Sequence, residues 1–139
     1  MSAWRRKALH LFPDLKYDLN ERSFTYYLLF FELRPMVHEA HLDHNHVLLR
    51  KIYCYAEWCL RQPNDLGNAA AVVFYEHLFQ SQKNIWNLIV PWLSPYVITN
   101  CHVFWELFHA PEEIEEIDNL CEARREFFYR DCHQYISIL

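Results

Sequence analysis

Apolar residues recur every three or four positions along most of the chain, which is the spacing of one face of an α-helix. The clearest example follows Asn45, a residue that can cap a helix. One side of this predicted helix consists of Leu48, Ile52, Tyr55, Ala56 and Cys59, and the other consists of Arg50, Cys54, Glu57 and Arg61. The pattern therefore predicts an amphipathic helix with Cys54 and Glu57 on its polar side.

Capping residues and prolines mark the helices of the N-terminal third. Ser2 can cap a first helix, on which we expect the basic residues to point mostly outward; these are Arg5, Arg6 and Lys7. Ser23 can cap a second helix that starts at Phe24. Proline disrupts a helix interior, so Pro35 is expected either to kink this second helix or to end it near Leu33.

The C-terminal half contains four further predicted helices, one of which runs from Lys83 to Leu93 with an apolar stripe of Ile85, Leu88, Ile89 and Trp92. Residues 68–79 are apolar nearly all round, which predicts a central, buried helix. Ser94 and Pro95 supply an N-cap and a first-turn proline for the next helix. Pro111 opens the last helix, whose apolar stripe consists of Ile114, Ile117, Leu120, Cys121, Phe127 and Phe128.

Short connections between these helices favour antiparallel neighbours. We therefore expect one compact all-α domain over residues 1–139, built from about six to seven helices stacked as antiparallel hairpins. The single glycine, Gly67, agrees with this fold class, because tight β-hairpin turns depend on glycine. It also excludes a Walker loop, a GxGxxG dinucleotide site and a GxSxG nucleophile elbow, each of which needs at least two glycines.

Charge and cysteine content limit the partners and the compartment. The formal net charge is −5, which argues against binding a nucleic-acid backbone. The five cysteines include no CxxC pair, so we expect reduced thiols and neither a zinc ribbon nor a redox motif. No apolar run is long enough to span a bilayer. We expect a soluble, cytoplasmic protein that binds neither nucleic acid nor membranes.

Four of the nine histidines lie between residues 38 and 46. His38, His41 and His44 have the i, i+3 spacing of a helical metal site, but they span an arc of about 120°, which is broad for one ion. The zinc-protease motif HExxH is not met, because Leu42 occupies the position of its second histidine. We interpret the cluster as a solvated surface, keep these three histidines as the weaker metal-binding alternative, and expect no cofactor.

Two other groups of residues resemble fragments of catalytic sites. Glu106 and His109 have the Glu-x-x-His spacing of di-iron bundles, but the chain has no second such motif to complete a two-metal site. Glu57, Glu76 and His77 fall in apolar helices, where a paired structural network is the more common outcome. Neither group provides a nucleophile, so we expect no enzymatic activity.

The acidic run from Glu112 to Asp118 is the best candidate for a partner contact. Its isoleucines are spaced to point inward, which leaves Glu112, Glu113, Glu116 and Asp118 outward. Such a face is typical of a solvated helix start, where the helix dipole favours acids, and equally of a docking surface for a basic partner.

Four segments resemble a family of small, uncharacterised bacterial all-helical proteins: residues 4–15, 55–62, 68–79 and 91–95. The resemblance runs from residue 4 to about residue 107. It implies an all-helical fold and brings no catalytic residues. In general character the chain also resembles immunity proteins, which bind and block one toxin. We therefore expect a non-enzymatic protein-binding protein that blocks a basic toxin; the alternatives are a metal-binding helical protein and a general adaptor module.

Overall fold

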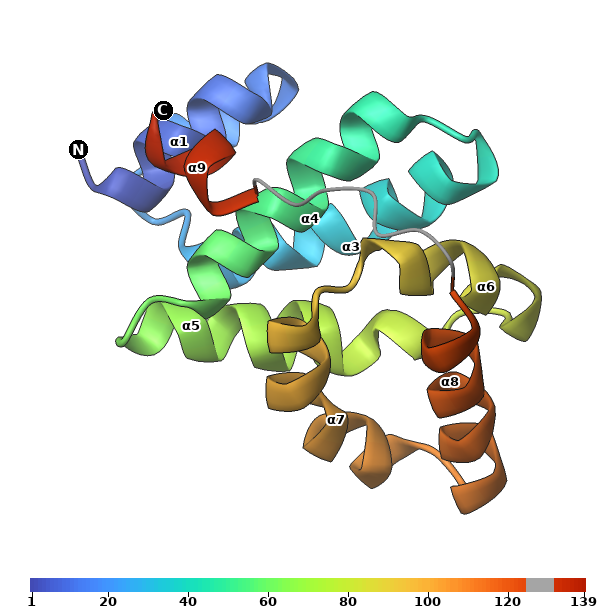
Figure 1. Ribbon diagram of the computed structural model, residues 1–139. Helices are drawn as coiled ribbons and strands as arrows, with labels where there is room; N and C mark the ends of the chain where they lie inside the picture. The colour runs from blue at the N-terminus through green and yellow to red at the C-terminus, as the bar shows by residue number, and fades with distance from the viewer. Residues whose placement is uncertain (125–131) are drawn as a thin grey trace.

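The computed structural model describes residues 1–124 and 132–139, and it consists mainly of helices joined by short loops (Figure 1). The all-α prediction is confirmed, since these described residues contain no strand. The α-helices are α1 (Ala3–Leu11), α2 (Lys16–Asn20), α3 (Tyr26–Leu42), α4 (His46–Leu60), α5 (Asp65–Ala69), α6 (Trp86–Ile89), α7 (Pro95–Phe108), α8 (Pro111–Ala123) and α9 (Cys132–Ser137). Shorter 3-10 or π segments connect them: η1 (Pro13–Leu15), η2 (Ala70–Phe74), η3 (Tyr75–Gln80), η4 (Lys83–Ile85) and η5 (Val90–Trp92).

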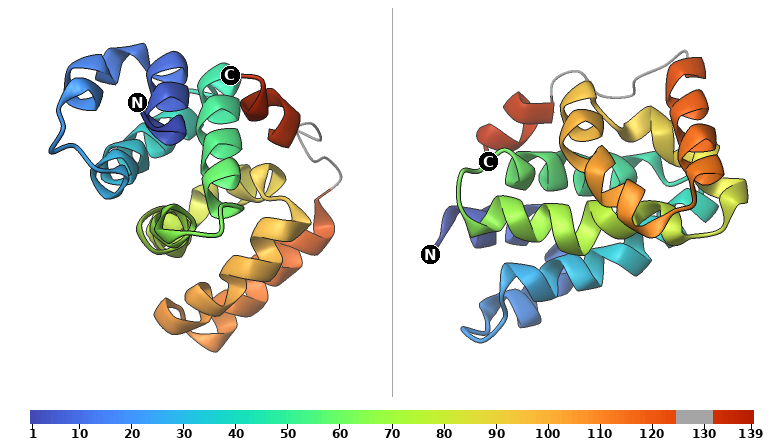
Figure 2. Two further views of the ribbon diagram at one scale, coloured as in Figure 1. Left: turned by 90° about the vertical axis from the view of Figure 1, so that its left-hand side faces the viewer. Right: turned by 90° about the horizontal axis from the view of Figure 1, so that it is seen from below.

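The centre of the molecule consists of α3, α4 and one long helical rod. The rod is formed by α5, η2 and η3, which follow one another without a break over residues 65–80. It packs against both α3 and α4, and Figure 2 (left) shows it end-on beneath them. Most of its side chains are buried, which confirms the predicted central helix over residues 68–79.

The start of α3 differs from expectation, and of the two alternatives for Pro35 the one that ended the helix near Leu33 is wrong. The helix begins at Tyr26, and the cap is Thr25, whose Oγ1 accepts a hydrogen bond from the Leu28 amide at 3.3 Å, rather than Ser23. The helix also continues through Pro35 to Leu42 instead of ending near Leu33. Proline in a helix interior costs about 3 kcal/mol. Burial of apolar side chains on both sides of Pro35 outweighs this cost; they are Leu29, Phe30, Leu33 and Val37.

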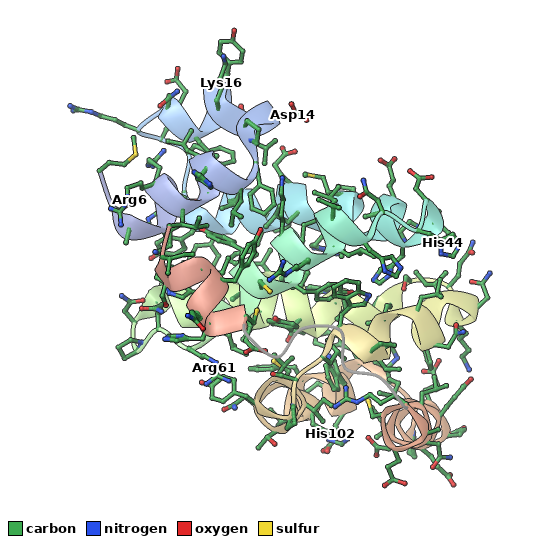
Figure 3. The ribbon with its side chains drawn as sticks, turned by 45° about the horizontal axis from the view of Figure 1, so that its top comes forward. Arg6, Asp14, Lys16, His44, Arg61 and His102 are labelled. Carbon is green, nitrogen blue, oxygen red and sulfur yellow. The ribbon has the colours of Figure 1, made fainter. Side chains whose placement is uncertain are left out.

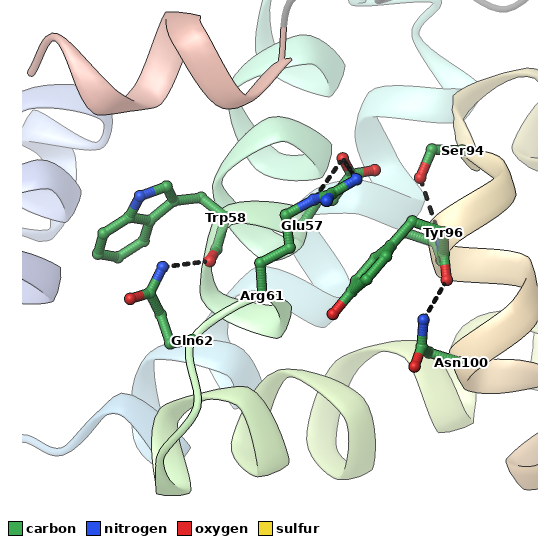
Figure 4. Close-up of polar contacts among 8 residues, drawn as sticks. Glu57, Trp58, Arg61, Gln62, Ser94, Tyr96 and Asn100 are labelled. Atoms are coloured by element: carbon green, nitrogen blue, oxygen red, sulfur yellow. Dashed lines mark hydrogen bonds and ion pairs between the residues drawn. The ribbon is translucent and has the colours of Figure 1, made fainter.

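Asn45 caps α4 as predicted, since its Oδ1 accepts a hydrogen bond from the Leu48 amide at 3.2 Å. The middle of the predicted polar side, Cys54 and Glu57, is nevertheless buried, because other elements cover it. α9 lies along α4, and the Arg50 guanidinium stacks on the Tyr135 ring at 4.2 Å. Figure 4 shows Glu57 paired with Arg61 close to Tyr96 of α7. Cys54 is consequently fully buried and Glu57 nearly so.

Lys7 was predicted to point outward, but its side chain is buried. Its Nζ donates a hydrogen bond to the Ile136 carbonyl of α9 at 2.9 Å, so it ties the first helix to the last. Burial and the neighbouring Arg6 lower the pKa of Lys7. Arg5 also forms hydrogen bonds within the fold. It donates to three backbone carbonyls, those of Leu19, Glu21 and Phe24.

The helices α7 and α8 form an antiparallel pair beside the end of the rod (Figures 1 and 2). Ser94 caps α7 through the Val97 amide at 3.2 Å, with Pro95 in the first turn, as predicted. Trp105 anchors α7, because its Nε1 donates to the Tyr75 carbonyl of the rod at 2.8 Å. α8 begins at Pro111 as predicted and ends at Ala123; Phe127 and Phe128 lie outside the described residues.

A membrane crossing requires about 20 consecutive apolar residues in one helix. In the described ranges, none of the helices combines that length with that apolarity.

Candidate functional site

The acidic residues predicted as a docking face all lie on α8, but their environments differ. Glu112 and Glu116 are exposed, whereas Glu113 and Asp118 are half-buried. The Lys83 ammonium lies 3.6 Å from a carboxylate oxygen of Glu113 and 3.6 Å from one of Glu116. Glu113 Oε1 also accepts a hydrogen bond from the Ala110 amide at 3.1 Å, which lowers the pKa of Glu113. Half of the predicted face therefore serves the local structure of α8.

Asp118 belongs to a cluster that joins α7 to α8. His102 of α7 lies 2.8 Å from Asp118 Oδ1 through its Nε2 and 2.6 Å from Glu106 Oε1 through its Nδ1; Figure 3 labels this histidine. Burial lowers the pKa of His102, but the hydrogen bonds to Asp118 and Glu106 outweigh burial, so its pKa is raised. The protonated ring donates to both carboxylates and links the two helices.

Exposed apolar side chains accompany the acids at the junction between α7 and α8. Val103, Leu107 and Phe108 of α7 are 56%, 69% and 51% exposed. They lie in the last turns of α7, directly before the acidic first turns of α8. We call Leu107, Phe108, Glu112 and Glu116 the junction surface. Exposed apolar groups rimmed by polar residues are a feature of protein-interaction sites in general.

The histidine cluster does not form the single solvated surface that the sequence suggested. His41 is only 2% exposed, and its Nε2 lies 2.6 Å from the hydroxyl of Tyr53. Burial, assisted by the neighbouring histidines, lowers the pKa of His41 to about 4. His44 and His46 are exposed, and His44 adopts a left-handed φ of 52° in the loop after α3. The prediction of a solvated cluster is wrong for His41, because its side chain faces α4 rather than solvent.

The metal-binding alternative receives no support from this geometry. Across residues 1–124 and 132–139, no group of three or more His, Cys, Asp or Glu side chains is arranged to hold a metal ion. Glu106 pairs with His102 instead of joining His109. His109 is buried against Trp86, with its Nδ1 3.4 Å from Glu113.

The feature that sequence reasoning missed is a cavity of about 460 Å³ between α3, the η3 end of the rod and the η4–α6 segment. Its polar lining consists of Arg34, His38, His41, His77, Gln80 and Ser81. None of the described residues that line it is an Asp or a Glu. A sequence signal did exist, because Phe31, Arg34, Pro35 and His38 have the i, i+3, i+4, i+7 spacing of one helix face.

Both long walls of this cavity depart from regular α-helix. Pro35 has no N–H, so it cannot donate to the Phe31 carbonyl one turn earlier. On the opposite wall the rod passes from the π segment η2 into the 3-10 segment η3 at Phe74, which itself lines the cavity. Such irregular segments are frequent at functional sites, since they redirect side chains from a straight helix.

His77 lines the cavity, and its neighbour Glu76 is buried. The His77 ring bridges two neighbours, with its Nε2 3.5 Å from Glu76 Oε2 and its Nδ1 2.8 Å from Gln80 Oε1. The ring also contacts Phe108 of the junction surface at 5.9 Å between centroids. Glu57 pairs with Arg61, as in the structural network expected for buried carboxylates.

All five cysteines are free, and four of them are buried. Burial raises the pKa of Cys101 to about 12 and that of Cys121 to about 11, and it also raises the pKa of Cys59. These three thiols are therefore protonated at neutral pH and lack the thiolate that a cysteine nucleophile requires.

A family model described as Domain of unknown function (DUF7674) matches residues 5–106. This span is nearly that of the resemblance seen in the sequence. Every residue that lines the cavity lies inside it, whereas α8 and its acids lie beyond it. Among curated proteins and solved structures, none matches the chain.

Proposed function

Since the chain belongs to the family described as Domain of unknown function (DUF7674), whose description names no activity, we propose its function from its own surface. We propose that it is a non-enzymatic protein-binding protein that docks onto a basic partner through the junction surface. The match to the family ends at residue 106, so this proposal concerns this chain rather than the whole family.

The observation that carries the proposal is the pairing of exposed apolar and acidic side chains at this junction. Leu107 and Phe108 leave more than half of their surfaces in water, and Glu112 and Glu116 follow them on α8. Apolar side chains at the centre of an interface contribute most of the binding energy, while charges at the rim steer a partner of opposite sign. The formal net charge of −5 favours the same kind of partner.

We propose further that the partner is a basic toxin domain of a bacterial system and that the protein acts as its inhibitor in the cytoplasm. A small helical protein needs only to cover a functional surface of the toxin, which requires no catalytic group of its own. The free cysteines agree with a reducing compartment. Their buried, protonated thiols agree with a role in packing rather than in catalysis.

The test compares two charge-reversal variants in binding to a partner isolated from the native cells. We expect the wild-type protein to retain one basic protein stoichiometrically. In the variant Glu112→Lys/Glu116→Lys the association rate should fall by about tenfold at low salt, with a smaller loss at high salt. The matched control, Glu32→Lys/Glu39→Lys, changes the charge equally at exposed positions of α3.

A partner that binds both variants at the wild-type rate would remove the junction surface from the interface. Loss of binding by the α3 variant alone would move the interface to the other side of the molecule. A general adaptor would differ from a toxin inhibitor by leaving the activity of the isolated partner unchanged.

A further inference from the structure

Both basic and apolar side chains line the cavity between α3, η3 and α6, and we infer that it binds a small organic carboxylate with an apolar body. This inference is independent of the proposed partner docking, because it concerns other residues and another class of ligand.

Charge is the first reason for an anionic ligand. One arginine and three histidines line the cavity, and the described lining contains no carboxylate. Arg34 is half-buried, and its guanidinium lies over the exposed Phe31 ring at 5.6 Å, which holds it at the opening by a cation–π contact. A guanidinium presents paired N–H donors that match the two oxygens of a carboxylate. Arg34 is therefore the residue expected to bind the ligand's charged group.

The three histidines add polar groups to the lining of the cavity. His38 and His77 are half-buried at the cavity, on opposite walls. His77 already donates to or accepts from Gln80 and lies near Glu76, so its ring is held in place. His41 is neutral at neutral pH because burial lowers its pKa to about 4. Arg34 is the one Lys or Arg among the described residues that line the cavity.

The interior is the reason for an apolar body. The side chains of Val37, Phe74, Leu78 and Ile85 line the cavity and are less than 10% exposed, so they form preformed apolar walls. A volume of about 460 Å³ lies within the range of small-molecule sites in proteins, roughly 300–1,000 Å³. Seven of the 13 lining residues are apolar and six are polar, so the cavity offers contacts to both an apolar body and a polar group.

The experiment uses three probes with one alkyl chain and different charged groups: octanoate, octan-1-ol and octylamine. Binding to the full-length protein is followed by shifts of backbone amide signals in NMR titrations at neutral pH. We expect octanoate to bind about tenfold more tightly than octanol, since a hydrogen bond to a charged group is worth about 1.5–3 kcal/mol. Octylamine should bind most weakly, and the shifted amides should belong to α3, η3 and α6.

The variant Arg34→Met keeps much of the aliphatic stem and removes the charge, and it should lose the preference for octanoate over octanol. Arg6→Met is the matched control, because Arg6 is exposed on α1 and does not line the cavity (Figure 3). It should bind octanoate as the wild type does.

Three results would overturn the inference. Equal affinity for octanoate and octanol would show that no charged group is recognised. Shifts confined to residues outside α3, η3 and α6 would place the ligand elsewhere. Unchanged octanoate binding by Arg34→Met, with wild-type amide spectra proving that the variant is folded, would exclude the assigned residue.

Discussion

His41 and His102 occupy two regions that treat the same side chain in opposite ways. In the wall of the cavity, burial lowers the pKa of His41 to about 4, and its Nε2 lies 2.6 Å from the neutral hydroxyl of Tyr53. Between α7 and α8, burial also lowers the pKa of His102, but two carboxylates raise it above its ordinary value. The surroundings of His41 disfavour charge on its ring, whereas the surroundings of His102 retain charge in ion pairs.

The difference teaches that the local density of histidine is a poor guide to charge. The dense cluster of residues 38–46 contains the histidine that resists protonation, and the isolated His102 is the one that favours it. Packing against the rest of the fold has a larger effect on the pKa of His41 than its neighbours in the sequence. Four substitutions, from the largest expected effect to the smallest, test how far this contrast holds.

The largest effect should come from Trp105, which tests whether ion pairs or apolar burial holds α7 in place. Trp105 is fully buried, donates to the Tyr75 carbonyl at 2.8 Å and packs edge-on against Phe79 at 5.0 Å. We expect Trp105→Ala to lower the free energy of unfolding by about 3–5 kcal/mol, measured by urea denaturation. The control Phe108→Ala removes a ring that is half exposed and should cost less than about 1 kcal/mol.

If Trp105→Ala lowered the free energy of unfolding no more than Phe108→Ala does, apolar burial would not be what holds α7 in place. The ion pairs between α7 and α8 would then be the main stabilising contacts of this region.

The second effect concerns the pH dependence that His41 imposes on stability. Its pKa in the folded protein is about 4, below the ordinary value of 6.5. Above about pH 6.5 both the folded and the unfolded state carry neutral His41, so its contribution is fully present. Between about pH 6.5 and about pH 4 only the unfolded state takes up the proton, and stability is lost by up to about 3 kcal/mol.

Replacing His41 by Gln removes the titrating group and keeps a polar partner for Tyr53. The free energy of unfolding of His41→Gln should therefore decrease less between pH 7 and pH 4.5 than that of the wild type, as measured by urea melts at several pH values. The exposed His10→Gln serves as the control, because His10 is not one of the histidines that lower the pKa of His41. If the free energy of unfolding depended on pH equally in the wild type and in His41→Gln, the folded protein would not disfavour the charged form of His41.

The third substitution, Tyr53→Phe, removes the hydroxyl next to His41 and keeps the ring that stacks on Trp92 at 5.7 Å. It leaves the Nε2 of His41 without this partner in a buried place. We expect a loss of about 1–2 kcal/mol at pH 7 in urea denaturation. Tyr17→Phe, on a ring that is 79% exposed, should be neutral, and a neutral Tyr53→Phe would show that solvent reaches His41.

Helical periodicity predicted the fold class and several boundaries correctly, because capping and apolar spacing act locally. Asn45, Ser94 and Pro111 each mark a helix start as predicted. The errors occur where a distant segment covers a helix. Lys7 and Cys54 lie on polar sides by periodicity, yet they are buried near α9, which the sequence pattern did not separate from α8.

The candidate sites show the same difference between features set by the local sequence and features set by distant segments. The acids of α8 could be placed outward from their spacing alone, since Ile117 is buried and Glu112 and Glu116 are exposed. The cavity could not be predicted, because it depends on how α3 and the rod approach each other across residues distant in the sequence. Periodicity shows which residues share one helix face but not what faces them.

The smallest effect should come from His102, because pairs near the surface contribute little to stability. Its raised pKa means that the stabilisation is fully present below about pH 6.5, where the ring is charged in both states, and is lost as the pH rises through the raised value. We expect His102→Gln to cost less than about 1 kcal/mol at pH 6 and still less at pH 9.

The titration of the His102 ring itself, followed by NMR, gives the sharper test. Its midpoint should lie above 6.5 in the wild type and fall in both Glu106→Gln and Asp118→Asn, because each variant removes one carboxylate that favours the charged ring. Glu116→Gln, which removes a carboxylate paired with Lys83, should leave the midpoint unchanged. A wild-type midpoint below 6.5 would mean that burial outweighs both carboxylates, and the contrast between His41 and His102 would then be one of degree rather than of sign.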